Sequence, residues 1–154
     1  MIHNTSIIES KNIGEGTNIW AFSHISKGAS IGKNCTIGEG VHIGPNVVIG
    51  DNCKIQNHAL IYEGVKIGNN VFIGPNVVTT NDLHPRALGK WDIVNTEIQD
   101  FVSIGANSTI LCGIKLEEGC MVAAGSVVVK DVPTYSLVLG NPACYVKKID
   151  RKYE

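Results

Sequence analysis

The chain has 154 residues, a length typical of one domain. Hydrophobic residues make up 44% of it and aromatic residues only 6%, which favours a core of thin aliphatic layers. The formal net charge of −1 gives no reason to expect nucleic acid or an anionic membrane as a partner. The longest apolar run, 121–129, is far shorter than the roughly 20 residues of a membrane-spanning helix. The N-terminus lacks the pattern of a signal peptide, so we expect a cytoplasmic protein.

Isoleucine recurs at every sixth position from Ile7 to Ile73. Four positions after each of these isoleucines, from Ile13 on, comes a small or β-branched residue. Three positions after most of them comes Gly or Asn, which tolerate a left-handed backbone, although Phe22 and His58 break this rule. A short, fixed period predicts a solenoid in which each repeat packs only against its neighbours. Each hexad should form a short strand and a tight corner, and three hexads should close one coil of 18 residues.

The repeats divide the chain into five parts. Residues 1–6 read as a lead-in strand, 7–78 as twelve hexads, and 98–133 as six more. The ladder stops over 80–97, which contains charged residues, a Pro and a Trp, and an insertion of this kind is expected to leave a solenoid as a functional surface loop. We therefore predict about six coils within a domain of residues 1–134, an excursion loop at 80–97, and a C-terminal tail at 135–154.

One side of the predicted prism carries most of the polar and aromatic exceptions. Hexads that start at 19, 37, 55 and 73 are 18 residues apart and should stack. Two interpretations stay open for this side: contact between subunits alone, or contact together with a binding site. His24 and His42 should stack one coil apart. The residues assigned to this side are Trp20, Phe22, His24, His42, Gln56, Asn57 and His58.

The five cysteines favour free thiols. Cys35 and Cys53 should stack in the inward column of small residues, where the strand spacing alone would permit a bridge. A reducing cytoplasm disfavours disulfides. Cys120 belongs to the same column, whereas Cys112 and Cys144 lie outside it. Because no His or Cys stands at metal-ligand spacing from them, no metal site is predicted.

Three stretches resemble a known family. Thr80-Asn81 followed by Pro85-Arg86 resembles the loop of nucleotide-linked amino-sugar N-acetyltransferases, and so does Lys54-Ile55-Gln56-Asn57 followed by Ile61-Tyr62-Glu63-Gly64-Val65. Lys130-Asp131-Val132-Pro133 and then Gly140-Asn141-Pro142-Ala143 resemble the usual end of hexapeptide-repeat acyltransferases. With the repeats, the resemblance covers almost the whole chain. It implies an all-β, left-handed parallel β-helix, whereas crossover rules alone favour the opposite hand. It also implies a homotrimer with active sites between adjacent subunits.

The implied activity is acetyl transfer from acetyl-CoA to the amine of a nucleotide-linked sugar, in the synthesis of surface polysaccharide such as lipopolysaccharide O-antigen, capsule or S-layer glycan. Asn81 would orient the amine, and His84 is the candidate general base because an unperturbed imidazole titrates near neutral pH. The candidate substrate-binding residues are Gln56, Asn57, His58, Tyr62 and Arg86. By resemblance, the coenzyme A arm and nucleotide would contact Gly105, Ala106, Ala123, Ala124, Lys130, Pro142 and Lys147.

Two other functions stay open. Leu83-His84-Pro85 resembles the Gly-His-Pro of sugar O-acetyltransferases with this fold, which would make His84 an obligatory base for a hydroxyl acceptor. A non-transferase is the other alternative, either a carbonic-anhydrase-like protein with histidines such as His24 and His42 at a shared metal, or a structural trimer. The residues leave open whether the nucleotide is UDP or dTDP, which sugar it carries, and where the amine stands.

Overall fold

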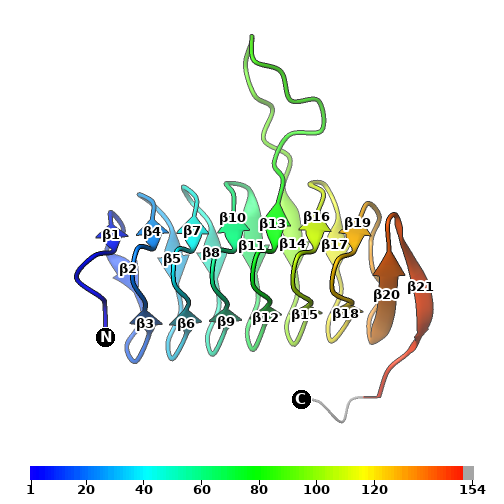
Figure 1. Cartoon of the computed structure of the whole chain (residues 1–154), viewed down its shortest axis with the longest axis horizontal. Helices are drawn as coiled ribbons and strands as arrows, with labels where there is room; N and C mark the ends of the chain where they lie inside the picture. Colours follow the sequence, from blue (N-terminus) through cyan, green and yellow to red (C-terminus); the bar gives the residue numbers. More distant parts are fainter. Residues whose placement is uncertain (151–154) are drawn as a thin grey trace.

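The structure, a computed structural model, describes residues 1–150. Over these residues the chain winds into a left-handed parallel β-helix with three sheets and no helix, and one long loop projects from its side (Figure 1). The predicted solenoid is therefore confirmed. The last four residues of the predicted tail, 151–154, lie outside the described part.

Each face of the prism is one sheet. The first sheet has seven strands: β1 (Ile7–Ile8), β4 (His24–Ile25), β7 (His42–Ile43), β10 (Leu60–Ile61), β13 (Val78–Thr79), β16 (Thr109–Ile110) and β19 (Val127–Val128). The second has six: β2 (Asn12–Ile13), β5 (Ser30–Ile31), β8 (Val48–Ile49), β11 (Val65–Ile67), β14 (Thr96–Ile98) and β17 (Lys115–Leu116). The third has eight: β3 (Asn18–Ile19), β6 (Thr36–Ile37), β9 (Lys54–Ile55), β12 (Phe72–Ile73), β15 (Ser103–Ile104), β18 (Met121–Val122), β20 (Ser136–Gly140) and β21 (Ala143–Lys148).

The core consists of two inward columns. From Ile19 to Ile110 the periodic isoleucines are buried, and the small residues that follow them, such as Ala29 and Val47, fill the space beside each corner. At the corners the chain turns through residues of positive φ, mostly Gly and Asn. Phe22 (φ 58°) and His58 (φ 59°) adopt the same conformation although their side chains disfavour it. Buried apolar layers and coil-to-coil backbone hydrogen bonds together hold the stack.

The predicted register is wrong at its first isoleucine. Ile8, not Ile7, pairs with Ile25, while Ile7 pairs with the outward His24 and is 59% exposed. Ile2 also forms a bridge with Ile19. In both pairs, Ile8 with Ile25 and Ile2 with Ile19, the two residues are 17 positions apart, one fewer than the 18 of a regular coil. Ile7 fits the six-residue period and Ile8 does not, so only the pairing with the next coil reveals the shift.

The helix has about seven turns, one more than predicted, since the first sheet contains seven strands. The described part of the predicted tail is also mainly strand. β20 pairs in parallel with β18, and β21 folds back antiparallel on β20, so the pair closes the C-terminal end. The sequence of this segment lacks the isoleucine period, which is why it read as a tail.

The excursion loop connects β13 to β14. Because β14 begins at Thr96, the loop spans 80–95, and the predicted range 80–97 includes two strand residues. Its two limbs meet at the prism, where the backbone N–H of Val94 donates to the carbonyl oxygen of Asn81 (2.9 Å).

All five cysteines are free thiols, as expected. Four are buried and Cys144 is exposed. Cys35 and Cys53 stack on successive coils, with the backbone N–H of Cys53 3.4 Å from the Sγ of Cys35.

Candidate functional site

A hollow of about 260 Å³ lies where the excursion loop leaves the first sheet. We call it the base hollow. Most of its lining is apolar, with a few amide, hydroxyl and carboxylate groups, as is usual for small-molecule sites. Its lining residues are Tyr62, Val78, Thr79, Thr80, Asn81, Asp82, Pro85 and Trp91.

Asp82 ties the loop together beside this hollow. Its Oδ1 accepts a hydrogen bond from the backbone N–H of His84 (2.7 Å), and its Oδ2 accepts one from Asp92 (3.4 Å). The first contact is an Asx turn, which Asp commonly forms with the residue two positions ahead. Thr79 fixes the opposite wall, because its Oγ1 accepts the N–H of Tyr62 (3.0 Å). Asp82 is not among the residues predicted from the sequence, although its spacing from His84 is a signal for this turn.

The base hollow joins two of the predicted site residues. Asn81 and Tyr62 both line it, although they come from the loop and from the end of β10. His84 and Arg86 do not line it; both are exposed on the loop, and the Arg86 guanidinium donates to the carbonyl oxygen of Pro85 (2.9 Å). Within one chain, the candidate base and the candidate amide therefore do not share the hollow.

Gln56 and Asn57 lie elsewhere, in a shallow cavity of about 200 Å³ that also includes Trp20 and Glu39. Asn57 Oδ1 accepts the backbone N–H of Glu39 (3.1 Å), a bond that links successive coils. His58 occupies the corner between the third and first sheets, where it is exposed. These three predicted substrate residues are thus not brought to the base hollow.

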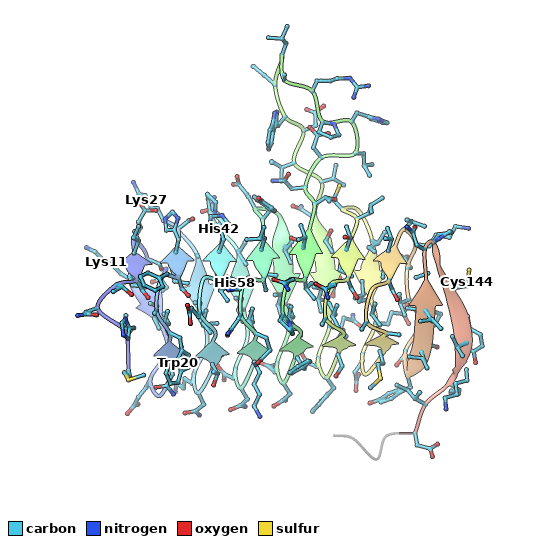
Figure 2. All side chains as sticks on the ribbon, viewed as in Figure 1. Lys11, Trp20, Lys27, His42, His58 and Cys144 are labelled. Atoms are coloured by element: carbon cyan, nitrogen blue, oxygen red, sulfur yellow. The ribbon has the colours of Figure 1, made fainter. Side chains whose placement is uncertain are left out.

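The prediction that one face carries both Trp20 and the two histidines is wrong. Trp20 follows β3 of the third sheet, whereas His24 and His42 stand on β4 and β7 of the first sheet. The corner at Phe22 turns the chain between them. Figure 2 separates the labelled Trp20, His58 and His42 across the prism. The expected stacking of the two histidines is confirmed, with ring centroids 5.3 Å apart.

The residues predicted for coenzyme A fall into two groups. Gly105 and Ala106 follow β15, and Ala123 and Ala124 follow β18 one coil later, so they stack at the corner between the third and first sheets. We call these four residues the glycine-alanine step. A Cβ on Gly105 would lie only 2.7 Å from Ala124 Cα and 2.9 Å from the Ala123 carbonyl carbon, so the coils meet there backbone against backbone. The second group, Lys130, Pro142 and Lys147, is exposed near the C-terminal end.

The base hollow and the glycine-alanine step lie on successive coils. Thr80 at the start of the loop donates its backbone N–H to the carbonyl oxygen of Ile110 in the next coil (3.0 Å). Ala106 precedes Ile110 by four positions, across the corner at Asn107 (φ 58°), so their Cα atoms lie at most about 14 Å apart. The loop therefore does not stand at the far end of the prism from the step.

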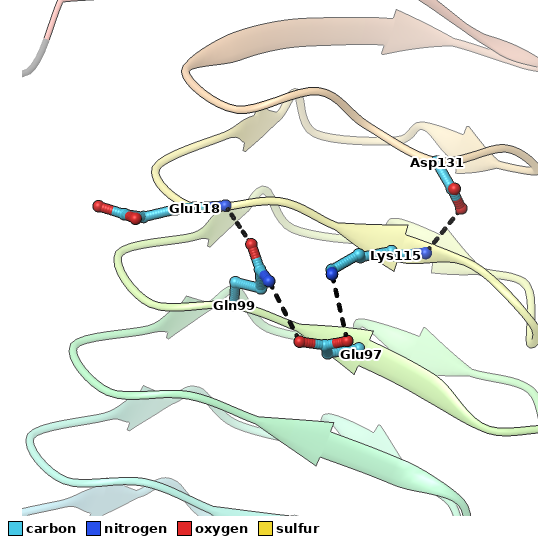
Figure 3. Close-up of polar contacts among 5 residues, drawn as sticks. All are labelled: Glu97, Gln99, Lys115, Glu118 and Asp131. Carbon is cyan, nitrogen blue, oxygen red and sulfur yellow. Dashed lines mark hydrogen bonds and ion pairs between the residues drawn. The ribbon is translucent and has the colours of Figure 1, made fainter.

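A larger groove of about 660 Å³ follows the second sheet on the other side of the loop. Figure 3 shows its charged row. Lys115 Nζ lies 3.5 Å from Glu97 Oε2, Gln99 donates to Glu97 Oε1 (3.1 Å), and Asp131 accepts the backbone N–H of Lys115 (2.8 Å). The hydrogen bond from Gln99, aided by Lys115, lowers the pKa of Glu97. None of the predicted site residues lines this groove.

Among residues 1–150, no group of three or more His, Cys, Asp or Glu side chains is arranged to hold a metal ion. Over the same residues, no helix has the length and apolarity needed to cross a membrane.

Comparison with known proteins identifies the repeat. The sequence profile described as bacterial transferase hexapeptide (six repeats) matches residues 10–45, 46–81 and 95–130, which is more than two thirds of the chain. Among curated proteins, 2,3,4,5-tetrahydropyridine-2,6-dicarboxylate N-acetyltransferase of Clostridium perfringens is 54% identical over 55 residues, which cover 36% of this chain and 23% of that protein. The chain thus spans about a quarter of this relative's length.

The solved structures that are similar to this chain include two with bound acetyl-CoA or coenzyme A. A hexapeptide-repeat-containing acetyltransferase from Vibrio cholerae, in complex with acetyl-CoA, is 28% identical with a TM-score of 0.63, covering 80% of this chain and 72% of that one. A variant of AntD, an N-acyltransferase from Bacillus cereus in complex with dTDP-4-amino-4,6-dideoxyglucose and coenzyme A, is 20% identical with a TM-score of 0.73, covering 94% and 87%, and supports the fold alone. With the profile match over most of its coils, this chain belongs to the bacterial transferase hexapeptide family.

Proposed function

We propose that this protein is an acetyl-CoA-dependent N-acetyltransferase that acts on a nucleotide-linked amino sugar. The acetylated sugar is a cytoplasmic precursor for the synthesis of surface polysaccharide. Its family and its resemblance to a C. perfringens amine N-acetyltransferase support acetyl transfer to nitrogen. The AntD complex provides a precedent for a nucleotide amino sugar on the same fold.

The observation that carries the proposal is the position of the base hollow, with Asn81 in its wall, on the coil next to that of Gly105 and Ala106. Acetyl transfer requires an amine nitrogen near a thioester carbonyl carbon, with a group to orient it. In this assignment the pantetheine arm runs along the glycine-alanine step, whose largest side chain is a methyl group. The Asn81 amide orients the amine.

The reaction itself is simple in its bonds. The neutral amine attacks the carbonyl carbon, the C–N bond forms, and the C–S bond breaks to leave the coenzyme A thiolate. The nitrogen loses a proton, and the thiolate gains one. His84 remains our candidate for the proton acceptor, and a water or the departing thiolate is the alternative. In a single chain His84 is exposed and outside the hollow, so this role depends on a neighbouring copy or on the bound substrate.

A homotrimer is part of the proposal, because one chain leaves the site incomplete. Gln56, Asn57 and His58 lie apart from the base hollow, and a neighbouring copy would bring such a set to it. The loop also carries exposed apolar side chains that a neighbour would cover, including Leu88 (90% exposed) and Trp91 (59% exposed).

The test is thiol release from acetyl-CoA with a panel of acceptors: UDP- and dTDP-linked 3-amino and 4-amino sugars, an amino dicarboxylate, L-serine and a simple sugar alcohol. We expect turnover with a nucleotide amino sugar. Turnover of only the sugar alcohol, abolished in His84→Ala, would replace the proposal with O-acetylation. No turnover, together with stoichiometric zinc in the purified protein, would favour a carbonic-anhydrase-like protein.

A further inference from the structure

A continuous row of outward side chains crosses the first sheet and ends at the base hollow. Glu9 Oε2 lies 3.1 Å from His24 Nε2. The His24 and His42 rings meet edge to face, with centroids 5.3 Å apart and planes at 61°. The His42 and Tyr62 rings follow, with centroids 5.6 Å apart and planes at 53°. We call Glu9, His24, His42 and Tyr62 the first-sheet row.

Tyr62 is the point where this row meets the candidate site. Its backbone is fixed by the bond from its N–H to Thr79, and its side chain lines the base hollow. Tyr62 is 37% exposed, so the neighbouring coils do not bury it completely. The contact with His42 constrains the ring on the other side.

His42 is suited to hold the Tyr62 ring because it is a neutral ring. Burial lowers its pKa, and the neighbouring His24 lowers it further. An uncharged imidazole can present an edge or a face to aromatic neighbours without the larger desolvation penalty of the charged ring. Glu9 bonds to His24 and so fixes the far end of the row.

We propose that His42 is a positioning residue that holds the Tyr62 ring against the acceptor sugar in the base hollow. His24 and Glu9 support His42 from behind. The inference rests on the proposed function, because it assigns the base hollow to the acceptor rather than to coenzyme A. It predicts that damage to the row affects acceptor binding and leaves acetyl-CoA binding unchanged.

The groups that face His42 set a pH dependence. On the β4 side these are His24 and, beyond it, Glu9; on the β10 side they are Tyr62 and, next to it, Glu63, which accepts from Asn46 Nδ2 (3.0 Å). Protonation of His42 would place its charge beside His24, with the one carboxylate of the row already bonded to His24. The row should therefore loosen, and the KM for the acceptor should rise, as the pH falls below the ordinary histidine range.

The experiment compares steady-state kinetics of the full chain with those of His42→Ala, His42→Gln and the control His3→Ala. His3 lies in the lead-in, where its ring contacts Thr5. We expect His42→Ala to raise the KM for the acceptor about three- to tenfold, as befits one lost ring contact, with the KM for acetyl-CoA and kcat little changed. His42→Gln should remove the acid-side rise in acceptor KM, and His3→Ala should match the wild type.

Other results would overturn the inference. An unchanged acceptor KM in His42→Ala would do so while leaving the proposed function intact. A smaller assembly mass for His42→Ala by light scattering would assign the row to a subunit contact instead. If the wild type acetylates no amino sugar, the proposed function fails, and the row is tested by NMR of the histidine side chains. The signal of His42 is identified by its loss in His42→Gln. Tyr62→Leu must then shift the titration of that signal. An unshifted titration would refute the contact on which the inference rests.

Discussion

Replacing Gly105 by alanine isolates the close stacking of the glycine-alanine step. The added Cβ would lie 2.7 Å from Ala124 Cα and 2.9 Å from the Ala123 carbonyl carbon, and both obstacles are backbone atoms. Real Cβ atoms do not approach other atoms so closely, so one coil must move away from the next. Overpacking of this kind costs about 1–3 kcal/mol. Because movement of backbone atoms is less easily accommodated than a side-chain rotation, we expect about 2–3 kcal/mol here.

The assay is thermal unfolding at a fixed chain concentration, which matters if the protein assembles. For a chain of this length, the expected loss corresponds to a fall in Tm of about 4–12 °C. Gly125→Ala is the matched control, because it has open space around the new Cβ and only its positive φ of 73° to oppose it. That strain amounts to about 1 kcal/mol. A Gly105→Ala protein that melts no lower than Gly125→Ala would refute the stacking argument.

The same variant separates packing from cofactor binding. If Gly105 serves only the repeat, the KM for acetyl-CoA should stay at its wild-type value despite the lower Tm. A KM that rises severalfold at a temperature where the variant is fully folded would support contact with the pantetheine arm.

Four further predictions concern other parts of the chain. His58→Gly should raise the free energy of unfolding by up to about 1 kcal/mol, since Gly adopts the φ of 59° without strain. An unchanged denaturation midpoint would contradict this strain. The same variant should raise the KM for the acceptor if His58 contacts the substrate. Leu88→Ser combined with Trp91→Ser should lower the assembly mass in light scattering, and an unchanged mass would mean that the loop tip is not an interface. A thiol reagent should modify Cys144 quickly and the other four cysteines only after unfolding; rapid reaction of a second thiol would contradict their burial. The free energy of unfolding, measured by urea titration, should fall as the pH drops below 6.5, because the unfolded chain binds a proton at His42 more readily than the folded chain does. This fall should be smaller in His42→Gln.

Some of the site was visible in the sequence and some was not. Asn81 and Tyr62 were selected by resemblance, and they line one hollow. Asp82, which fixes the loop, was not selected, although its spacing from His84 is typical of an Asx turn. Gln56 and Asn57 belong to the same resemblance as Tyr62, yet a corner of the coil separates them from it.

The assignment of faces shows why such errors arise. The period determined that His24 and His42 stack, because residues 18 apart repeat the same contacts in every coil. The predicted side took each hexad as one face, although the corner inside the hexad, at Phe22 and at Gly40, turns the chain before it reaches His24 and His42. At the N-terminus, Ile7 keeps the six-residue period, so the shift of the register to Ile8 appears only in its pairing with Ile25.

The sequence by itself determined the solenoid, its 18-residue coil and the place where the loop interrupts it, because residues that recur every 18 positions repeat the same burial and the same corner only when they lie on successive coils. The tertiary structure decided the rest: the closing strands β20 and β21 and the walls of the base hollow. These depend on residues that the period does not relate, such as Tyr62 after β10 and Trp91 on the loop, which line the same hollow. Such residues come together only when the coils are stacked and the loop is anchored on them.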